Sequence, residues 1–174
     1  MARRGHEAVE ASTAVPNGPR ATVAAYTLSV TRLALSEAIQ DYLKEIYKLQ
    51  EASGRVTVTA LARRQGVSAA SASAMAKKLA ALELLELEPY RGFALTPAGE
   101  RVAIEVIRHH RLLELYLAET LGLDVDAVHD EADKLEHVLS EELEERIDRA
   151  LGFPTHDPHG DPIPNAQLEW PAPL

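Results

Sequence analysis

Apolar residues recur at helical spacing through most of the chain beyond residue 35, and short polar or glycine-containing stretches separate the helical segments. The first segment, 36–52, starts at Ser36, whose hydroxyl suits an N-cap, and has Glu37 in its first turn. Its apolar stripe consists of Ile39, Leu43, Ile46 and Tyr47. The pattern predicts a helix that ends before Gly54. By this pattern alone Asp41 lies off the stripe, as a surface carboxylate would.

Two shorter helical segments follow, and a tight turn separates them. The first begins at Thr57 or Thr59 and ends at Gly66. Ser68 then caps the second, which extends over residues 69–84. Two short helices joined by a turn that contains glycine predict a helix-turn-helix motif.

The second of these helices has a surface suited to DNA. Its N-terminal half, 69–74, contains only alanine and serine, so its backbone can approach a groove while serine hydroxyls reach phosphates or base edges. Two lysines follow within one to two turns, where they would meet the phosphate backbone. A low-complexity surface helix is the alternative interpretation. The residues predicted to contact DNA here are Thr59, Ser68, Ser71, Ser73, Lys77 and Lys78.

Residues 84–100 read as strand, turn and strand, followed by the start of a new helix. Tyr90, Arg91 and Gly92 form the tip, and Thr96-Pro97 has the residue types preferred at a helix N-cap and first position. A hairpin directly after the second helix of a helix-turn-helix is the wing of a winged helix. Arg91 stands where a wing touches a phosphate or the minor groove. Together these motifs predict a winged-helix DNA-binding domain.

The second half of the chain is predicted to be entirely helical. A long helix runs from Pro97 to Gly122, Asp124 is positioned to cap a helix over 125–139, and Ser140 to cap another over 141–151. Some apolar residues exceed what so small a bundle needs for its own core: Leu112, Leu115, Tyr116, Leu135 and Leu139. We therefore expect a homodimer through these helices, whose two-fold symmetry would match a palindromic operator on double-stranded DNA.

Metal-ligand side chains are concentrated in the same half. His110 and Glu114 lie four residues apart, and the spacing of His129, Asp133, Glu136 and His137 puts these four on one face of a single predicted helix. Like charges at such spacings destabilise a helix unless a cation binds them. Without thiolates, the set suits manganese or iron(II), and zinc, cobalt or nickel can enter it.

Other histidines and other kinds of metal site fit the pattern less well. His109 is expected to be a bystander, and His156 and His159 lie in an irregular tail where, with Asp157, they would bind metal weakly. The HExxH motif of zincin proteases is absent. The repeated ExxH motifs of di-iron bundles are also absent.

Charge is distributed unevenly over this chain of 174 residues and net charge −9. Residues 1–54 are neutral, with six basic and six acidic side chains; residues 55–101 carry +3 (seven and four), and residues 102–174 carry −12 (five and seventeen). A basic middle beside an acidic half suggests polyanion contact in one and cation binding in the other. Acidic residues of the last helix are expected to face solvent: Glu141, Glu142, Glu144 and Glu145.

No segment has the length and apolarity of a membrane span, and the N-terminus lacks the apolar core of a secretory signal. The absence of cysteine fits a cytoplasmic protein. Residues 1–34 are expected to be a flexible extension. A short helix near Val23–Leu33 is the alternative for part of it. Residues 154–174 are expected to be a Pro-rich tail or linker.

Residues 35–164 resemble the diphtheria-toxin-repressor and manganese-transport-regulator family of metal-dependent transcriptional repressors. The resemblance is carried by DYLKEIYKL (41–49), YRGFALTPAGE (90–100), RHHRLLE (108–114) and GLDVDAVHDEADKLEHVLSEELEERI (122–147). It implies a winged helix over 35–100 and a helical metal-binding dimerisation domain over 101–153. It also implies two metal positions per subunit, with metal binding favouring operator DNA.

Carried over residue by residue, the resemblance implies one site made of Asp41, Asp133, Glu136 and His137, and a second made of His110, Glu114 and His129. Hard oxygen ligands at Asp41 and Asp133 are similar to the manganese branch, which favours Mn2+ over Fe2+; Zn2+, Co2+, Ni2+ or Cd2+ would enter the sites in vitro.

Two features depart from the family pattern. Lys44 stands where the manganese branch has a second carboxylate, which puts that branch's paired-metal arrangement in doubt, whereas His129 is typical of the iron branch. Many members continue past a GNPIP-like segment into a small β-barrel. Here the corresponding GDPIP occupies 160–164, ten residues before the last residue given.

The fold predicted from these observations is mainly α-helical, with an N-terminal winged helix-turn-helix and a helical metal-binding dimerisation domain. The predicted function is a metal-dependent transcriptional repressor of metal-uptake genes, not an enzyme. A metal-independent winged-helix regulator is one alternative. A carboxylate–histidine metallohydrolase is the other, although no separate nucleophile or oxyanion donor is evident.

Overall fold

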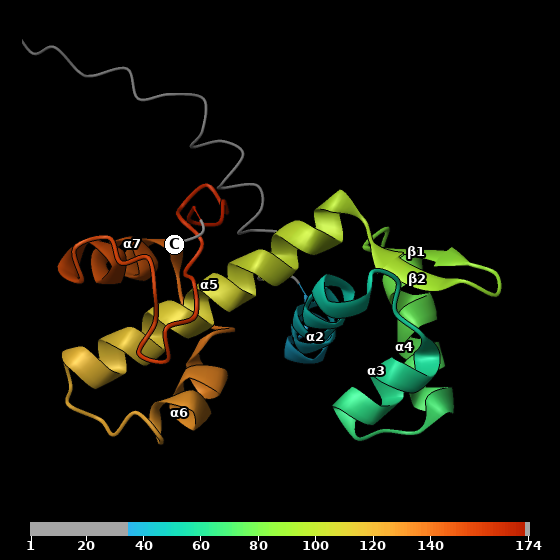
Figure 1. Ribbon diagram of the computed structural model, residues 1–174, viewed down its shortest axis with the longest axis horizontal. Coiled ribbons are helices and arrows are strands. Elements are labelled where there is room, and N and C mark those ends of the chain that lie inside the picture. The colour runs from blue at the N-terminus through green and yellow to red at the C-terminus, as the bar shows by residue number, and fades with distance from the viewer. Residues whose placement is uncertain (1–34, 173–174) are drawn as a thin grey trace, which may run out of the picture.

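The computed structural model describes residues 35–172 and is mainly helical (Figure 1). Its order of elements is α2 (Glu37–Ser53), α3 (Val58–Gln65), α4 (Ala69–Ala81), β1 (Leu85–Glu88), β2 (Gly92–Leu95), α5 (Pro97–Glu119), α6 (Val128–Leu135) and α7 (Glu141–Ala150). A winged helix occupies one end and helices α6 and α7 the other, and α5 runs between them. The predicted fold class is confirmed.

Side-chain caps fix the starts of the helices in the winged-helix half. Thr57, rather than Thr59, caps α3 by accepting a hydrogen bond from the Ala60 N–H at 3.1 Å. Ser68 accepts from the Ser71 N–H and Thr96 from the Gly99 N–H, both at 3.1 Å. Ser36 is the N-cap residue of α2 by position, but its side chain makes no cap hydrogen bond.

The wing is a two-stranded antiparallel hairpin in which Leu85 pairs with Leu95 and Glu88 with Gly92. Gly92 has a positive φ of 87°, and a Cβ there would lie 2.3 Å from the Val56 carbonyl oxygen, so glycine is required at this position. Phe93 forms an isolated bridge with Val56 and is almost fully buried. The hairpin is thereby joined to the chain just before α3.

Helix α5 connects the two hydrophobic cores. Its N-terminal turns contribute Val102, Ala103 and Ile107 to the core beneath the winged helix, where α2 also packs. Further along, Leu112, Leu113 and Leu115 pack with Ala132, Leu139, Ile147 and Ile163 in a second core. The domain boundary predicted at residue 100 falls inside this helix. A continuous helix therefore joins the DNA-binding half to the acidic half.

Helix α6 is shorter than the sequence pattern predicted, and the expectation of a helix over 125–139 is wrong at both ends. Asp124 does not cap α6: its carboxylate accepts from the Asp126 N–H and its carbonyl from the Ala127 and Val128 N–H groups, which builds a turn. The helix ends at Leu135. Glu136 and His137 consequently lie in the turn beyond α6, not on one helical face with His129.

The apolar residues predicted to form a dimer surface are mostly part of the chain's own core. Leu112, Leu115 and Leu139 are buried within one chain, which contradicts their assignment as surplus. Tyr116 is partly buried and only Leu135, at 40%, is exposed among the five. The second core is larger than expected because the segment after α7 adds Ile163 to it. Other apolar side chains in this half are exposed, including Leu121, Val138, Leu143 and Phe153.

The Pro-rich tail has no helix or strand between 154 and 172, as predicted, but it is folded against the rest of the molecule. Ile163 is buried, and the Trp170 indole donates to the Tyr47 hydroxyl at 3.0 Å while its ring stacks on that tyrosine. Arg111 on α5 lies over the same indole. This segment therefore ties α5 to α2.

Two further expectations concern the ends of the chain and membranes. The predicted extension over 1–34, with its open helix near Val23–Leu33, lies outside the described residues. Within 35–172, no helix is long and apolar enough to cross a bilayer.

Candidate metal centre

Three helices and one turn bring all seven predicted metal ligands together. Helix α5 supplies His110 and Glu114, α2 supplies Asp41, and α6 with the turn after it supplies the other four. Potential ligand atoms lie within 4.8 Å of one another in three overlapping triads: Asp41–Glu136–His137, His110–Asp133–Glu136, and His110–Glu114–His129. Glu136 belongs to the first two of these triads and His110 to the last two, so the three triads form one continuous cluster.

The grouping differs in one respect from the sets implied by the family resemblance. Asp133 was expected beside Asp41 and His137, but its Oδ1 lies 3.3 Å from His110 Nδ1. The carboxylate is 46% exposed, at the rim of the cluster. Glu136, by contrast, is fully buried and belongs both to the triad with Asp41 and to the triad with His110.

His110 is the centre of the cluster. Its Nδ1 is 2.6 Å from Glu136 Oε2, and its Nε2 is 3.1 Å from Glu114 Oε1 and 3.0 Å from His129 Nδ1. Burial lowers the pKa of His110, but the hydrogen bonds and charges of Glu114 and Glu136 outweigh burial and raise it to about 9. The imidazole is therefore protonated at neutral pH when no other cation is bound.

Glu114 accepts from both neighbouring imidazoles. Its Oε1 lies 2.9 Å from His129 Nδ1, in addition to its contact with His110. Burial raises the pKa of Glu114, yet these two histidines more than compensate and hold it at about 2. His159 from the tail comes within 3.8 Å of the same oxygen through its Nε2. The tail thus reaches this triad.

Gln40 orients the imidazole that faces Asp41, and the sequence reasoning did not single it out. The Nδ1–H of His137 donates to Gln40 Oε1 at 3.1 Å, while Nε2 lies 3.1 Å from Asp41 Oδ1 and 3.4 Å from Glu136 Oε1. Fixing one ring nitrogen as the donor turns the other towards the carboxylates. The sequence did offer a signal for Gln40: it is a polar residue three positions before Leu43, on the apolar face of the helix.

A buried ion pair also connects α2 with the turn after α6. Lys44 Nζ lies 2.6 Å from Glu136 Oε1 and 3.1 Å from Asp133 Oδ1. Burial lowers the pKa of Lys44, but the charges and hydrogen bonds of Glu136 and Asp133 raise it above its ordinary value. The ammonium group is therefore an integral part of the cluster.

A second buried polar network lies beside the cluster, and it overturns one expectation. Glu144 was expected to face solvent, but it is buried and accepts from Arg108 Nε and, at 2.8 Å, from His109 Nε2. His109 is fully buried, and its Nδ1 is 3.2 Å from the Glu136 carbonyl oxygen. It belongs to none of the three triads of the described residues, and its contacts lie in this neighbouring network. The helical spacing of Glu144 in α7 places it beneath α5, which composition alone did not show.

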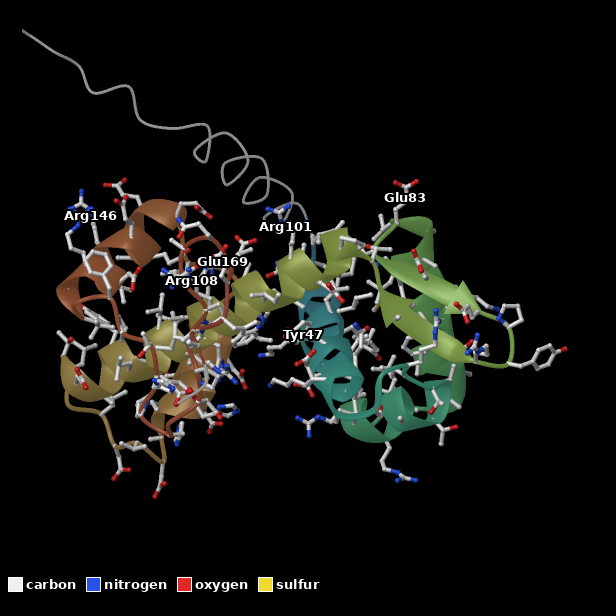
Figure 2. The ribbon with its side chains drawn as sticks, turned by 45° about the horizontal axis from the view of Figure 1, so that its top comes forward. Tyr47, Glu83, Arg101, Arg108, Arg146 and Glu169 are labelled. Atoms are coloured by element: carbon white, nitrogen blue, oxygen red, sulfur yellow. The ribbon has the colours of Figure 1, made fainter. Side chains whose placement is uncertain are left out.

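Arg108 extends this network to the tail. Its guanidinium donates to Asp148 Oδ2 at 2.8 Å and to the Pro164 carbonyl at 2.6 Å, in addition to Glu144. Figure 2 shows Arg108 among the helices, whereas Arg146 on α7 points outward. Burial raises the pKa of Glu144, but His109 and Arg108 outweigh it and hold the value at about 2. This network holds α5, α7 and the tail around the cluster.

The donor set of the cluster suits a divalent cation. The residues of the three triads comprise four carboxylates and three imidazoles, with neither thiol nor thioether among them. Carboxylate oxygen with imidazole nitrogen is the ligand combination of manganese, iron(II) and zinc. Buried carboxylates such as Glu114 and Glu136 also require a compensating positive charge. The side chains of the three triads therefore fit a divalent cation.

The residues predicted to contact DNA lie on α3, α4 and the wing. Thr59, Ser68, Ser71, Lys77 and Lys78 are exposed, and Ser73 is half-buried. Arg91 at the wing tip is 77% exposed and lies 3.6 Å from Glu88. The hydroxyl of the N-cap residue Ser68 shares a hydrogen bond of 2.9 Å with the hydroxyl of Ser71 in the first turn of α4. The elements that carry these residues, α3, α4 and the wing, lie at the end of the molecule distant from α7 (Figure 1).

A winged helix joined through one helix to a carboxylate–histidine cluster defines a class of DNA-binding proteins with a metal-binding helical domain. Two family models match this chain. The iron-dependent repressor N-terminal DNA-binding domain matches residues 34–93, and the iron-dependent repressor metal binding and dimerisation domain matches residues 96–165. The chain belongs to the iron-dependent repressor family.

Curated relatives agree with this assignment. The chain is 39% identical over 131 residues to the diphtheria toxin repressor of Corynebacterium efficiens, which covers 75% of this chain and 56% of that protein. It is 36% identical over 130 residues to the iron-dependent repressor IdeR of Mycobacterium bovis, with 75% and 56% covered. The chain thus spans just over half the length of these relatives.

Solved structures give the same fold. A manganese-dependent transcriptional repressor in complex with manganese is 48% identical, with a TM-score of 0.70, and the match covers 78% of this chain and 62% of that one. The manganese regulator SloR is 36% identical with a TM-score of 0.67, covering 76% and 61%. ScaR with bound Zn2+ is 36% identical with a TM-score of 0.66, covering 74% and 60%.

Proposed function

We propose that this protein is a manganese-dependent transcriptional repressor that binds a palindromic operator as a homodimer in the cytoplasm and controls metal-uptake genes. One observation carries the proposal. Asp41, on a helix of the DNA-binding half, lies 3.1 Å from His137, in the turn after α6. Ligand side chains from both halves of the molecule therefore meet at one point.

This meeting point supplies the coupling between metal and DNA. When bound, a divalent cation would supply positive charge shared by carboxylates of both halves. Asp41, Glu136 and His137 would then hold α2 and the turn after α6 in a fixed relation, and with them the orientation of α4. If the metal strengthens DNA binding by a given factor, linkage requires that DNA strengthen metal binding by that same factor. A coupling of roughly 1–3 kcal/mol corresponds to about 5–150-fold.

The ligand types support manganese over iron(II). Asp41 and Asp133 offer hard carboxylate oxygens, where a thiolate or thioether would favour softer metals. Among the structural relatives, one is described as a manganese-dependent repressor in complex with manganese, and ScaR has been solved with Zn2+ and with Cd2+. We therefore propose Mn2+ as the effector and Fe2+ as the alternative, while zinc, cobalt, nickel and cadmium enter in vitro.

The DNA surface and the dimer complete the proposal. Exposed hydroxyls of α3 and α4 would meet base edges or phosphates, and Lys77, Lys78 and Arg91 would neutralise phosphates. The matching metal binding and dimerisation domain supports a homodimer. Exposed apolar side chains of this half are available for it: Leu121, Leu135, Val138, Leu143 and Phe153.

An Asp41→Ala variant tests the coupling. Manganese titration against a palindromic duplex, selected from a random-sequence pool with the wild-type protein and manganese, should show metal-stimulated binding for the wild type and none for the variant. The dimer should persist in both by analytical ultracentrifugation. Glu37→Ala removes an exposed carboxylate one turn earlier on α2 and serves as the matched control.

Three outcomes separate the candidate functions. Manganese-stimulated DNA binding that survives Asp41→Ala contradicts the proposed coupling. DNA binding that is indifferent to manganese in the wild type supports a metal-independent winged-helix regulator. Turnover of a hydrolysable substrate by a chain without DNA affinity supports a metallohydrolase.

A further inference from the structure

One face of α2 carries a row of polar contacts with the acidic half. Gln40, Lys44 and Tyr47 stand at positions i, i+4 and i+7, which places them along one side of the helix, and all three are buried. The first two contact the cluster of potential metal ligands. The third contacts Trp170, 123 positions later in the chain. Helix α2 is therefore attached to the acidic half at a further point outside the cluster.

The contact between Tyr47 and Trp170 combines a hydrogen bond with ring stacking. The indole N–H donates to the Tyr47 hydroxyl at 3.0 Å, and the two rings are 6.1 Å apart between centroids with an angle of 20° between their planes. The Arg111 guanidinium carbon lies 5.6 Å from the centre of the indole. Stacked aromatic pairs and cations over indole rings are both favourable. Neither ring belongs to the three triads of the described residues, so this contact does not require a metal ion.

The segment that carries the indole is itself fixed to α5. Ile163 is buried in the second core with residues of α5. Arg108 and Arg111, both on α5, donate to the carbonyl oxygens of Pro164 and Pro162. The Pro-rich tail is thus held on α5 by three side chains before it reaches α2.

The position of α2 decides whether the two halves of the molecule can share a metal ion. Asp41 lies six positions before Tyr47 on the same helix, and its Oδ1 is 3.1 Å from His137 Nε2 in the turn after α6. A shift or rotation of α2 would separate these two atoms. A site whose ligands are already held together binds more tightly, because the cost of ordering them is not taken from the binding energy.

We infer that Trp170 is a positioning residue for the metal switch: its contact with Tyr47 holds α2 where Asp41 meets Glu136 and His137. Trp170 offers no ligand and acts only through the placement of α2. This inference rests on the proposed function, since it presupposes that the triad with Asp41 binds manganese. It makes the Pro-rich tail part of the switch.

The test compares Trp170→Ala with the wild type and with Glu169→Gln. Glu169 is the exposed neighbour of Trp170 and bonds Asn165 within the tail, so it controls for a change in this segment. Calorimetry measures manganese affinity, and fluorescence anisotropy of the selected duplex gives the manganese concentration for half-maximal DNA binding. Trp170 is the single tryptophan of the chain, so quenching of its fluorescence by acrylamide reports whether the indole is docked.

Trp170→Ala should raise the manganese concentration for half-maximal DNA binding by about tenfold, the loss expected from one stacked pair and one hydrogen bond. DNA affinity at saturating manganese should stay at the wild-type value, because the bound ion then holds Asp41 in place. Trp170→Phe can still stack on Tyr47 but cannot donate to its hydroxyl, and should lie between the two. Glu169→Gln should match the wild type.

Acrylamide quenching tests the contact without metal. The indole of the metal-free wild type should be quenched less than that of the urea-unfolded chain, and manganese should leave this quenching unchanged. An indole that is as accessible as in urea until manganese is added contradicts the inference.

A double variant separates positioning from a general loss of structure. In an Asp41→Ala background, Trp170→Ala should not change the affinity of the manganese that remains bound, because the residue through which Trp170 acts is already absent. An equal loss of affinity in both backgrounds shows a structural role only and contradicts the inference. If Trp170→Ala does not fold, the same comparison is made with Trp170→Phe.

The remaining failures are distinct. A wild-type manganese requirement in Trp170→Ala contradicts the inference while leaving the proposed function intact. A wild type that binds no manganese, or whose DNA binding ignores it, overturns the proposed function and this inference with it.

Discussion

At the scale of single residues, the geometry of the cluster depends on side chains that do not themselves offer a ligand. Gln40 Oε1 accepts a hydrogen bond from His137 Nδ1 and so directs Nε2 towards Asp41 and Glu136. The Gln40 amide is in turn held by the Leu35 carbonyl at 3.1 Å. The orientation of the ligand is thus set by the backbone at the start of α2.

Gln40→Leu should weaken manganese binding by about 10–100-fold, because the imidazole loses the acceptor that fixes its tautomer. Calorimetric titration with Mn2+ measures this, and nitrogen NMR of the His137 ring reports the tautomer directly. Gln40→Glu keeps an acceptor at the same place and should retain the wild-type tautomer. Wild-type affinity in Gln40→Leu would show that Gln40 does not position this ligand.

The same residues show what the sequence could and could not predict. His110 and Glu114 are neighbours on one helix, so their pairing follows from spacing alone. Asp41 looked like a surface carboxylate, and only the family resemblance placed it at the metal. The Lys44–Glu136 contact joins residues 92 positions apart, and no local pattern encodes such a contact.

At the scale of the elements, the sequence predicted where helices begin better than where they end. The caps Ser68, Thr96 and Ser140 have side-chain hydrogen bonds that a local motif is sufficient to specify. Helix α6 ends at Leu135 although its helical pattern continues, because the turn that follows is fixed by tertiary contacts of Glu136 and His137. Sequence periodicity does not contain those contacts.

The packing of α7 on α5 should make stability dependent on acid pH. The pKa of Glu144 is held at about 2, below its ordinary 4.5, by His109 and Arg108 after burial is overcome. A depressed carboxylate pKa contributes stability that is complete above 4.5 and is lost as pH falls from 4.5 to about 2. The shift corresponds to about 3 kcal/mol, to order of magnitude.

Glu144→Gln should therefore be less stable than the wild type at pH 7, and the difference should shrink as pH falls through this window. Urea unfolding at a series of pH values between 7 and 2 measures it. Glu145→Gln alters the neighbouring carboxylate, which is exposed and pairs with the exposed Arg149, and should match the wild type at every pH. A pH-independent difference for Glu144→Gln would contradict the depressed pKa.

At the scale of the whole molecule, the charges of the two halves have opposite roles. The winged-helix part carries the exposed Lys77, Lys78 and Arg91, whereas residues 102–174 have a net charge of −12. Helix α5 separates the DNA surface from most of this negative charge (Figure 1). The negative charge of the acidic half disfavours contact with DNA, which agrees with the match of residues 96–165 to a metal binding and dimerisation domain.

The salt dependence of DNA binding tests this separation. Each lysine that neutralises a phosphate should contribute about 0.9 to the slope of log K against log salt concentration, and a homodimer uses it twice. Lys77→Ala and Lys78→Ala should each lower the slope by about 2, measured by fluorescence anisotropy of the selected duplex at saturating manganese. Arg146→Ala removes an exposed charge at the far end of the molecule and should leave the slope unchanged (Figure 2). If the Lys variants weaken binding without lowering the slope, α4 does not contact the phosphates through these residues, and its proposed orientation on DNA is wrong.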